Sequence, residues 1–479
     1  MTTILSRTRV AAFFVLAVLA LAVVACGGQA TAPAAAPAAP AAPKAEAPKP
    51  AAATEAPKAA ATDAPKAAAP AAPAAGSILF HSSQFTPVQE REKMQNIVLK
   101  DAPMKVEFSP EDPGPFVDRV LAETKAGKVN VGVIGGLHGD FATFAKEDVL
   151  QDLTPLLSKL ADRKFPATFV ELGKLGTKDK QYYIPWMQAT YVLAINKKAL
   201  QYLPQGADVN ALTYDQLKQW GANIQKATNE RKIGFPAGPK GLMHRFTQGY
   251  LYPSYTGQPV ANFRSPEAVK MWTDFKDLWQ YVNPASTNYD FMQEPLKAGE
   301  VWIAWDHVAR LIDAVKDKPD DYILVPAPAG PKGRGFMPVI GGLAIPKGVA
   351  DQASAEKLIE YMTTPATQGT VLKELAFFPV VAGDLPKDLP VGVKMEADAV
   401  AMQANAKDAL PSLLPVGLGG KNGEWNKVYQ DTFNSIVLKG DDPAKVLDQQ
   451  AKIMQGILDD TKAACWPPDA PSTGACQVK

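Results

Sequence analysis

The sequence has few of the residues that build metal centres and covalent catalytic sites. Its 479 residues include three cysteines and four histidines, and no two histidines stand at a metal-ligand spacing within one segment. There is no Walker phosphate-binding loop, no Gly-x-Gly-x-x-Gly after a predicted strand, no His-Glu-x-x-His and no Gly-x-Ser-x-Gly. We therefore expect no metal, no cofactor and no catalytic residue, and we expect that the protein is not an enzyme. A pair of acid/base carboxylates, which needs no local motif, stays open as the alternative.

A strong excess of one charge is also missing. The chain has 50 Lys and Arg against 49 Asp and Glu, which gives a formal net charge of +1. Proteins that bind nucleic acid through its phosphates carry a basic excess. We therefore expect no nucleic-acid partner.

Long apolar runs are missing after residue 25. The first 25 residues contain Arg7 and Arg9 and then an apolar run over residues 10–25, which is shorter than the roughly 20 residues of a membrane-spanning helix. This pattern is typical of a secretory signal peptide, here residues 1–25. The sequence LAVVACG at 21–27 resembles a bacterial lipobox, whose cysteine is acylated, although a simple signal with an incidental cysteine is the alternative. We expect an exported protein, anchored through acylated Cys26 to the outer face of the cell membrane, on its periplasmic or extracellular side.

An Ala/Pro-rich segment follows the cysteine. Residues 30–75 hold 26 Ala and 10 Pro in 46 positions, with no aromatic and no branched aliphatic side chain. Such a segment cannot bury enough apolar surface to offset the entropy lost on ordering. We therefore expect residues 26–76 to be a disordered tether, and the folded body to begin at residue 77.

Predicted strands and helices alternate along the folded body. Strands are predicted at 78–80, 104–109, 129–134, 189–196, 322–326 and 342–346, and the helices between the first three at 87–99 and 116–125. The early β-α-β-α-β order predicts a parallel sheet with right-handed crossovers. The roughly 390 residues from 77 to 464 are more than one domain usually contains. We therefore predict an α/β protein of two lobes.

The last 15 residues, 465–479, form a tail rich in proline and glycine. It contains Cys465 and Cys476, the two cysteines that remain once Cys26 is assigned to lipid. Exported proteins meet an oxidising environment, in which two cysteines in one short segment favour a local disulfide. We expect Cys465 and Cys476 to be bonded to each other.

Four stretches of the body combine apolar strands with glycine, proline or tryptophan. They are VGVIGG at 131–136 running on to VLQDLTP at 149–155, YIPW at 183–186 running on to YVLAINK at 191–197, AGEVWIAWD at 298–306, and GGLAIPK at 341–347. In their order and spacing they resemble the extracellular solute-binding proteins of ABC importers, in the large sugar-binding, maltose-binding-protein-like group. The resemblance implies a two-lobed periplasmic-binding-protein-like fold with hinge crossings, in which residues 77–187 plus about 340–385 form the first lobe and residues 188–339 plus about 386–464 the second.

The same resemblance implies how such a protein works. The solute lies in the cleft between the lobes, and closure about the hinge brings both lobes onto it. The loaded form then docks on the membrane subunits of an ABC permease. We therefore expect the partners to be a small-molecule solute, the permease subunits and, through the lipid, the membrane, and we expect a monomer.

Candidate ligand-binding residues come from two arguments. Ligands of open parallel sheets lie beyond the carboxyl ends of the strands, which selects the loops that hold Gln84 and Asp140. A sugar presents a flat apolar face and a rim of hydroxyls, so its site needs aromatic faces beside carboxylates or amides, with glycine where the backbone must approach closely. The predicted ligand-binding residues are Gln84, Asp140, Trp186, Trp305, Asp306, Gly341, Gly342 and Trp425.

Other roles stay open for some of these residues. Asp140 could cap a helix over 141–146, and Trp186 and Trp425 could each pack in the core. Arg245 could pair with an anionic sugar or form an ordinary salt bridge. The sequence spacing does not decide between these roles.

These features together predict a lipid-anchored extracytoplasmic receptor that delivers a sugar or oligosaccharide to an ABC import permease. One alternative is a binding protein for a non-sugar solute, such as a polyamine, a phosphate ester or a metal chelate. Another is an exported carbohydrate-active enzyme. The near-zero net charge fits a neutral solute better than a strongly charged one.

Overall fold

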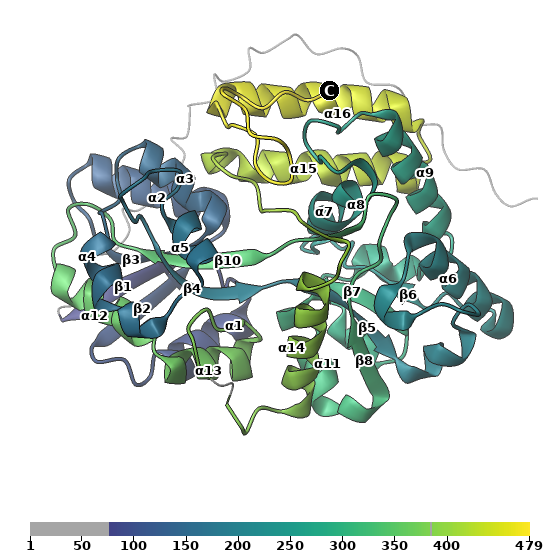
Figure 1. The fold of residues 1–479 in the computed structure, drawn as a ribbon, viewed down its shortest axis with the longest axis horizontal. Helices are drawn as coiled ribbons and strands as arrows, with labels where there is room; N and C mark the ends of the chain where they lie inside the picture. The colour runs from purple at the N-terminus through teal and green to yellow at the C-terminus, as the bar shows by residue number, and fades with distance from the viewer. Residues whose placement is uncertain (1–75, 384–385) are drawn as a thin grey trace, which may run out of the picture. The chain divides into compact units, whose positions relative to one another are not determined.

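The computed structural model describes residues 76–383 and 386–479. The predicted signal peptide, Cys26 and nearly all of the predicted tether lie outside the described residues. Two sheets organise the described part, and helices pack around both of them (Figure 1). Among the helices of this part, none is at once long enough and apolar enough to span a membrane.

The first sheet contains five strands in the order β2-β1-β3-β10-β4. Their bounds are β1 Ser77–Ser82, β2 Lys105–Pro110, β3 Val131–Leu137, β4 Ile184–Ala189 and β10 Val339–Ala344. β1 pairs in parallel with β2 and β3, whereas β10 runs antiparallel to both β3 and β4. The parallel arrangement predicted for the first three strands is therefore confirmed, and a strand from far along the chain joins their sheet.

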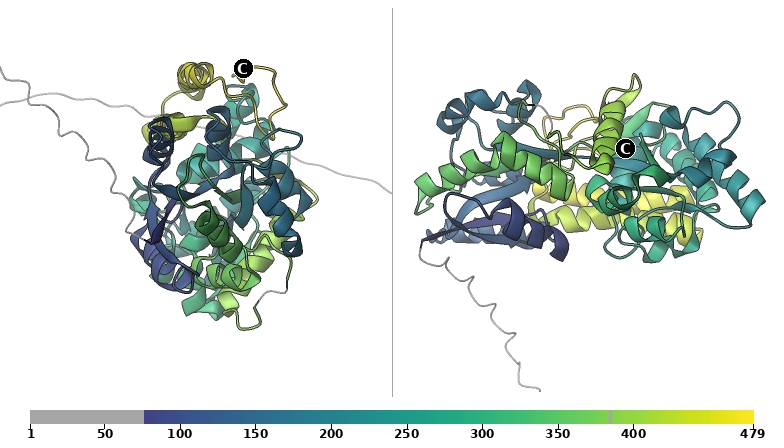
Figure 2. Two further views of the ribbon diagram at one scale, coloured as in Figure 1. Left: turned by 90° about the vertical axis from the view of Figure 1, so that its left-hand side faces the viewer. Right: turned by 90° about the horizontal axis from the view of Figure 1, so that it is seen from below.

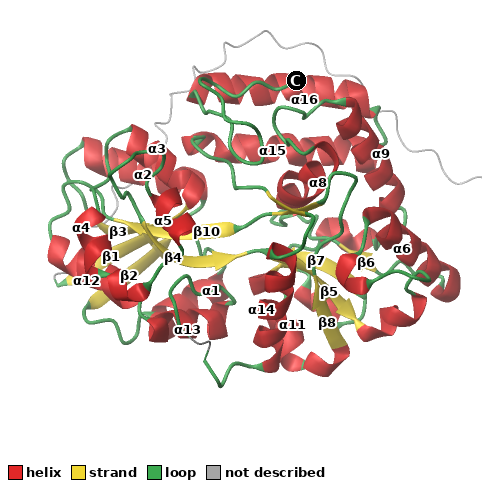
Figure 3. Ribbon diagram, in the orientation of Figure 1, coloured by secondary structure: helices red, strands yellow, loops and turns green. Residues whose placement is uncertain are grey.

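Helices follow each of the first three strands (Figure 3). The helices of this first lobe are α1 Val88–Lys93, α2 Pro113–Lys125, α3 His138–Lys146, α4 Thr154–Lys159, α5 Ala167–Gly173, α12 Gln352–Met362 and α13 Pro365–Leu375. Phe116, Val117 and Val120 of α2 are buried at helical spacing, which explains why this segment forms a helix against the sheet.

The second sheet has the order β6-β7-β5-β8. Its strands are β5 Tyr191–Asn196, β6 Ile233–Gly234, β7 Ile303–His307 and β8 Tyr322–Val325. β5 is antiparallel to β7 and β8, while β6 pairs in parallel with β7. Every residue of β5 is buried, because helices and neighbouring strands cover it on all sides.

The helices of the second lobe pack around this sheet. They are α6 Tyr214–Thr228, α7 Met243–Phe246, α8 Tyr252–Thr256, α9 Pro266–Trp279, α10 Gln293–Lys297, α11 Ile312–Asp317 and α14 Val391–Ala404. At the start of α9 the Ser265 hydroxyl accepts a hydrogen bond from the Ala268 N–H, and Pro266 occupies the first helical position. Trp272 of α9 is fully buried, so it belongs to the core of this lobe.

The chain passes between the two sheets at β4 and β5, which are separated by Thr190 alone. It returns through β9 (Arg334–Phe336), which pairs with β11 (Ala409–Pro411), and then through β10. α14 packs against α11 and β8, so the chain is back on the second sheet by Val391. Several extended segments therefore connect the lobes, which is the architecture of a hinge.

Two C-terminal helices, α15 (Asn422–Phe433) and α16 (Pro443–Thr461), pack on each other. α15 contacts α2 of the first lobe and α7 of the second, and α16 contacts α9. Figure 1 shows α16 at the top of the view with α15 below it, and the left view of Figure 2 also has one yellow helix at the top and the other beneath it. The C-terminal segment thus touches elements of both lobes.

The C-terminal tail is held on the second lobe. Cys465 and Cys476 form a disulfide. The Asp469 carboxylate accepts hydrogen bonds from the N–H groups of Val260 and Ala261, at 3.1 and 2.7 Å. The Lys479 N–H donates to the Ala261 carbonyl, so the tail is fixed by backbone contacts as well as by the covalent bond.

Candidate functional site

A pocket of about 160 Å³ lies between the two lobes. The first lobe lines it with the loop after β1, the start of α2, the end of β3 and residue Phe377, and the second lobe lines it from β5, α7 and the end of β7. The residues just after β1, the first residue of α2 (which follows β2) and the last residue of β3 line this pocket, so the strand-end rule applied to the sequence selects the same edge of the sheet. A molecule bound here would contact both lobes at once.

Two arginines of the second lobe line the pocket. Arg245, in α7, donates a hydrogen bond to the side chain of Gln248 at 3.1 Å. Arg310, just after β7, donates to the carbonyl of Asp290 at 3.3 Å and lies over the ring of Phe291, 4.5 Å from its centroid. Neither guanidinium has a carboxylate within 4.0 Å among residues 76–383 and 386–479.

The first lobe presents carboxylates on the other side of the pocket. Burial raises the pKa of Glu90 to about 7, and the opposing charges of Arg310 and Lys93 only partly offset this rise. Burial also raises the pKa of Asp140, opposed by hydrogen bonds from Leu137 and Ser83 and by the charge of Arg245. Acidic groups of one lobe therefore act on arginines of the other without forming ion pairs with them.

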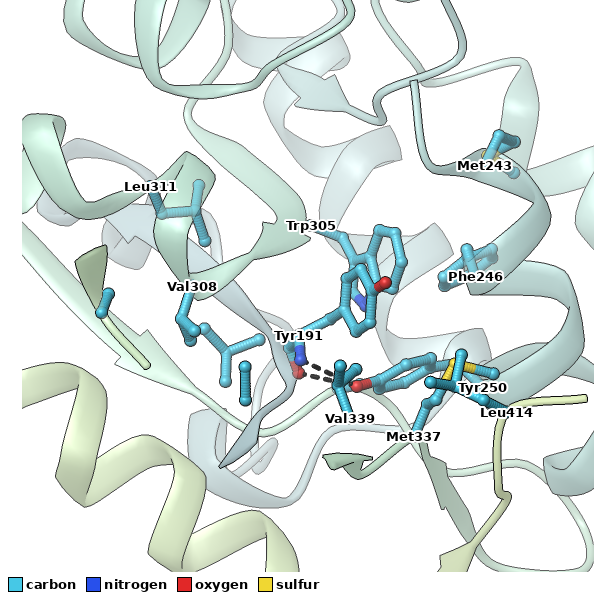
Figure 4. Packing of buried hydrophobic residues seen from close by; sticks show 14 of the residues in the cluster. Tyr191, Met243, Phe246, Tyr250, Trp305, Val308, Leu311, Met337, Val339 and Leu414 are labelled. Atoms are coloured by element: carbon cyan, nitrogen blue, oxygen red, sulfur yellow. Dashed lines mark hydrogen bonds between the residues drawn. The ribbon is translucent and has the colours of Figure 1, made fainter. Parts of the chain in front are cut away.

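Aromatic rings supply the apolar part of the pocket. Tyr191, Phe85 and Phe377 line it, and all three side chains are nearly buried. The backbone N–H and C=O of Tyr191 both hydrogen-bond to the hydroxyl of Tyr250, each at 3.0 Å, which fixes the first residue of β5 (Figure 4). A sugar ring or another flat group can pack against such rings.

His307 adds a neutral hydrogen-bonding group to the pocket. Its ring stands edge-on to Tyr191, with 5.0 Å between the centroids. Nδ1 accepts a hydrogen bond from the Ala309 N–H, so Nε2 carries the ring hydrogen. Burial, together with the charge of Arg310, lowers the pKa of His307 to about 3, so that the ring is uncharged at neutral pH.

Of the residues selected from the sequence, Gln84 lines the pocket directly. Its amide nitrogen donates to the Ser83 carbonyl at 2.9 Å, and the side chain is half-buried. Asp140 lies one hydrogen bond behind the lining, because its carboxylate accepts from the Ser83 hydroxyl at 2.9 Å. The same oxygen accepts from the Leu137 N–H at 2.9 Å. The helix begins at His138, with Leu137 as its N-cap, so Asp140 stands at the third helical position and is not the N-cap of a helix over 141–146; its carboxylate reaches back to the N-cap backbone.

The three tryptophans selected from the sequence are fully buried and do not line the pocket. Trp186 lies edge-on behind Phe85, with 6.0 Å between centroids. Trp305 lies behind Tyr191 and also meets Phe246 and Tyr250 edge-on. Trp425 lies in the first turn of α15 and packs against Trp466 of the tail, so its partner in the core comes from a different segment of the chain.

Asp306 and the two glycines also have structural contacts in place of pocket contacts. The buried Asp306 carboxylate accepts hydrogen bonds from the N–H groups of Met292 and His307, at 3.0 and 2.7 Å, and so holds the end of β7. A Cβ on Gly341 would lie 2.8 Å from Met187, and one on Gly342 would collide with Tyr183. These glycines are required by the close packing around β10.

Several pocket residues were not selected from the sequence. Arg310, Glu90, Tyr191, His307 and Phe377 stand in no recognisable motif, and Arg245 was considered only as one of two possibilities. For Tyr191 a signal existed, since it is the first residue after the crossing between the lobes. The others are brought together only by the packing of the two lobes.

The sequence matches the model of one protein family. Residues 93–395 match the model of a family described as bacterial extracellular solute-binding protein. No curated protein matches the sequence.

Solved structures give similar folds at low sequence identity. The GacH receptor of Streptomyces glaucescens, described unliganded and with acarbose, is 17% identical and superposes with a TM-score of 0.62 over 81% of this chain and 99% of its own. Maltose-bound MalE3 of T. maritima is 20% identical, with a TM-score of 0.63 over 80% and 100% of the two chains. UgpB of Mycobacterium tuberculosis with glycerophosphocholine is 19% identical, with a TM-score of 0.60 over 81% and 99%. At these identities the similarity establishes the two-lobed fold.

Proposed function

Because this chain belongs to the bacterial extracellular solute-binding protein family, we propose that it binds a sugar or oligosaccharide outside the cytoplasm and delivers it to an ABC import permease. It acts as a receptor, with no catalytic step. The observation that carries the proposal is the pocket between the lobes, which both lobes line with aromatic rings and hydrogen-bonding side chains. Two of the similar structures are described with acarbose or maltose.

The residues of the pocket fit the chemistry of a sugar. Tyr191, Phe85 and Phe377 offer ring surfaces for the C–H face of a pyranose, and Gln84, His307 and the arginines offer hydrogen bonds to its hydroxyls. The pocket volume of about 160 Å³ is below the roughly 300–1,000 Å³ typical of sites for drug-sized ligands, so it suits a single ring in this conformation. A longer saccharide requires the lobes to open further.

Ligand binding would favour closure for a thermodynamic reason. A solute that touches Gln84 on one lobe and His307 on the other gains both sets of contacts only when the lobes are closed. Its affinity for the closed state therefore exceeds its affinity for the open state, and this difference shifts the population toward closure. The permease would then recognise the closed form.

The placement outside the cytoplasm rests on the N-terminal sequence. We propose that Cys26 is acylated and holds the protein, as a monomer, on the outer face of the cell membrane, with residues 26–76 as a tether. For the lobes, the sheet membership of β4, β5 and β10 supports division near residues 187 and 340. A tether of this composition would let the body move about its anchor and still reach a permease in the same membrane.

The proposal is tested by thermal unfolding of the purified protein with a panel of mono- and oligosaccharides. A solute at about a hundredfold excess over its dissociation constant should stabilise the folded protein by about 2.7 kcal/mol. The variant Gln84→Ala should weaken the binding of that solute, whereas Gln201→Ala, an exposed glutamine outside the pocket, should not. A panel that produces no stabilisation at all would reject the sugar-receptor proposal.

A further inference from the structure

The charges in the pocket indicate which kind of sugar it would bind, and this inference rests on the proposed function. We infer that the solute is an acidic sugar of one ring, whose carboxylate or phosphate group is held by Arg245 and Arg310. The two guanidiniums line the same pocket from different elements of the second lobe. Both act electrostatically on the phenol of Tyr191, so both lie near this ring of the pocket.

Partial burial without a carboxylate partner sets these two arginines apart from the others in the part of the chain that the structure describes. Arg119, Arg163, Arg264 and Arg334 each lie within 3.5 Å of a carboxylate oxygen. Within residues 76–383 and 386–479, the arginines without such a partner are Arg91 and Arg231, which are exposed, and Arg245 and Arg310, which are partly buried in the pocket. Water hydrates the charges of the exposed pair, but closure of the lobes would remove water from the pocket pair, which is costly for an unpaired charge.

The acidic groups of the first lobe offset the charge of the two arginines only in part, because they act from a distance and form no ion pair with them. The Asp140 carboxylate is engaged by Ser83 and Leu137. Glu90, with a pKa of about 7, is only partly ionised at neutral pH. The pocket therefore keeps an excess of positive charge at neutral pH, and a neutral sugar would leave that excess buried on closure.

An anionic group on the solute would balance the charge of the two arginines and accept hydrogen bonds from them. Each guanidinium carries five N–H donors in a planar fork that matches a carboxylate or phosphate, and Arg245 uses one donor for Gln248 while Arg310 donates to backbone carbonyls. The remaining donors are available to a ligand. The ring of the same sugar would lie against Tyr191 and Phe377.

Calorimetric titration with matched pairs of sugars tests the inference. The pairs are glucuronate with glucose, galacturonate with galactose, and glucose 6-phosphate with glucose, and inorganic phosphate and acetate are titrated alone. We expect the acidic sugar of a pair to bind roughly 30-fold or more tightly than the neutral sugar, because the loss of one group from a buried charge pair lowers the affinity by at least this factor. A comparison of the uronates with the phosphate ester then shows whether the site accepts a carboxylate or a phosphate group.

Variants link the preference to the two arginines. Arg245→Gln and Arg310→Gln should each remove most of the preference for the acidic sugar, while Arg264→Gln, in an exposed ion pair with Asp448, should leave it unchanged. Arg245→Lys keeps the charge but loses the fork, and it should bind the acidic sugar with intermediate affinity. Circular dichroism checks that each variant folds. If Arg245→Gln does not fold, Arg245→Lys takes its place in the comparison.

The outcomes separate this inference from the proposed function. Equal affinity for the neutral and acidic members of a pair, unaffected by Arg245→Gln or Arg245→Lys, would overturn the inference and leave the sugar receptor intact. Binding of inorganic phosphate or acetate without any sugar would reject the sugar receptor but retain the arginines as the anion site. Binding of no member of the set would overturn the inference, and the panel of mono- and oligosaccharides then decides the proposed function separately.

Discussion

The ring of Tyr191 lies parallel to the indole of Trp305, with 4.8 Å between the centroids and an angle of 3° between the planes. Tyr191 lines the pocket and Trp305 lies behind it, fully buried. Trp305 would therefore affect a ligand in the pocket through the position of Tyr191. Figure 4 shows this pair among the apolar side chains that support it.

The first prediction concerns the role of Trp305 in the core. Trp305→Ala should lower the free energy of unfolding by about 3–5 kcal/mol, because it leaves a large cavity among Tyr191, Phe246 and Tyr250. Urea denaturation followed by circular dichroism measures this loss. Trp305→Phe keeps a ring against Tyr191 and should recover most of it. If Trp305→Ala unfolds like the wild type and loses only ligand binding, the indole contacts the ligand directly.

The second prediction concerns the pH dependence of binding an acidic sugar. Burial raises the pKa of Glu90 to about 7, so this carboxyl loses its proton between about pH 6 and 8. The resulting charge repels an anionic ligand and competes for Arg310, so the affinity should fall over this range, by roughly tenfold or less. His307, with a pKa lowered to about 3, stays neutral throughout. Calorimetric titration at several pH values measures the trend.

Glu90→Gln is the control for this effect, since the amide cannot ionise. Its affinity for the acidic sugar should stay flat between pH 6 and 8. A fall that persists unchanged in the variant would assign the pH dependence to another group, with the Asp140 carboxyl as the next one to test.

The third prediction concerns Glu396, a buried residue of α14. Both of its carboxylate oxygens lack a hydrogen-bond partner, and burial raises its pKa well above the ordinary value of 4.5. The folded state therefore holds the proton more tightly than the unfolded state does. The stability from this group is fully present below about pH 4.5 and is lost as the pH rises toward the folded-state pKa.

Glu396→Gln should remove this dependence. Relative to the variant, the wild-type protein should lose stability as the pH rises from 4 to 8, measured as the free energy of unfolding in urea at each pH. Glu424→Gln, an exposed residue paired with Lys421, should leave the wild-type trend in place. A constant difference between Glu396→Gln and wild type over this range would contradict the assignment.

The fourth prediction concerns the anchor. Cys26→Ser should move the protein from the membrane fraction to the soluble or secreted fraction, because the thioether-linked lipid cannot form. Fractionation followed by immunoblotting measures the distribution, and incorporation of labelled palmitate reports acylation directly. A Cys26→Ser protein that remains in the membrane fraction would show that something other than lipid on this cysteine holds it there.

The sequence by itself determined the class of the fold. The order of β1, α1, β2, α2 and β3 followed from local periodicity and from residues that favour helix ends, which depend on neighbours a few positions apart. The approach of Cys465 to Cys476 also lies within one short segment. These features depend on residues that are close together in the sequence, so a single sequence is enough to predict them.

Only the tertiary structure decided which residues line the pocket. A tryptophan packs equally well against a sugar or against another ring, so the sequence could not place Trp186, Trp305 or Trp425 in the core. The partners that bury them come from distant segments, as Trp466 does for Trp425.

The tertiary structure also decided which charged side chains meet in the pocket. A net charge of +1 averages over the whole chain and favours a neutral solute, yet the fold places Arg245 and Arg310 together without a carboxylate partner. These arginines are 65 positions apart, and Glu90 is a further 155 positions away. Coulomb interactions depend on distance in space and on burial, and only the packing of the two lobes sets both.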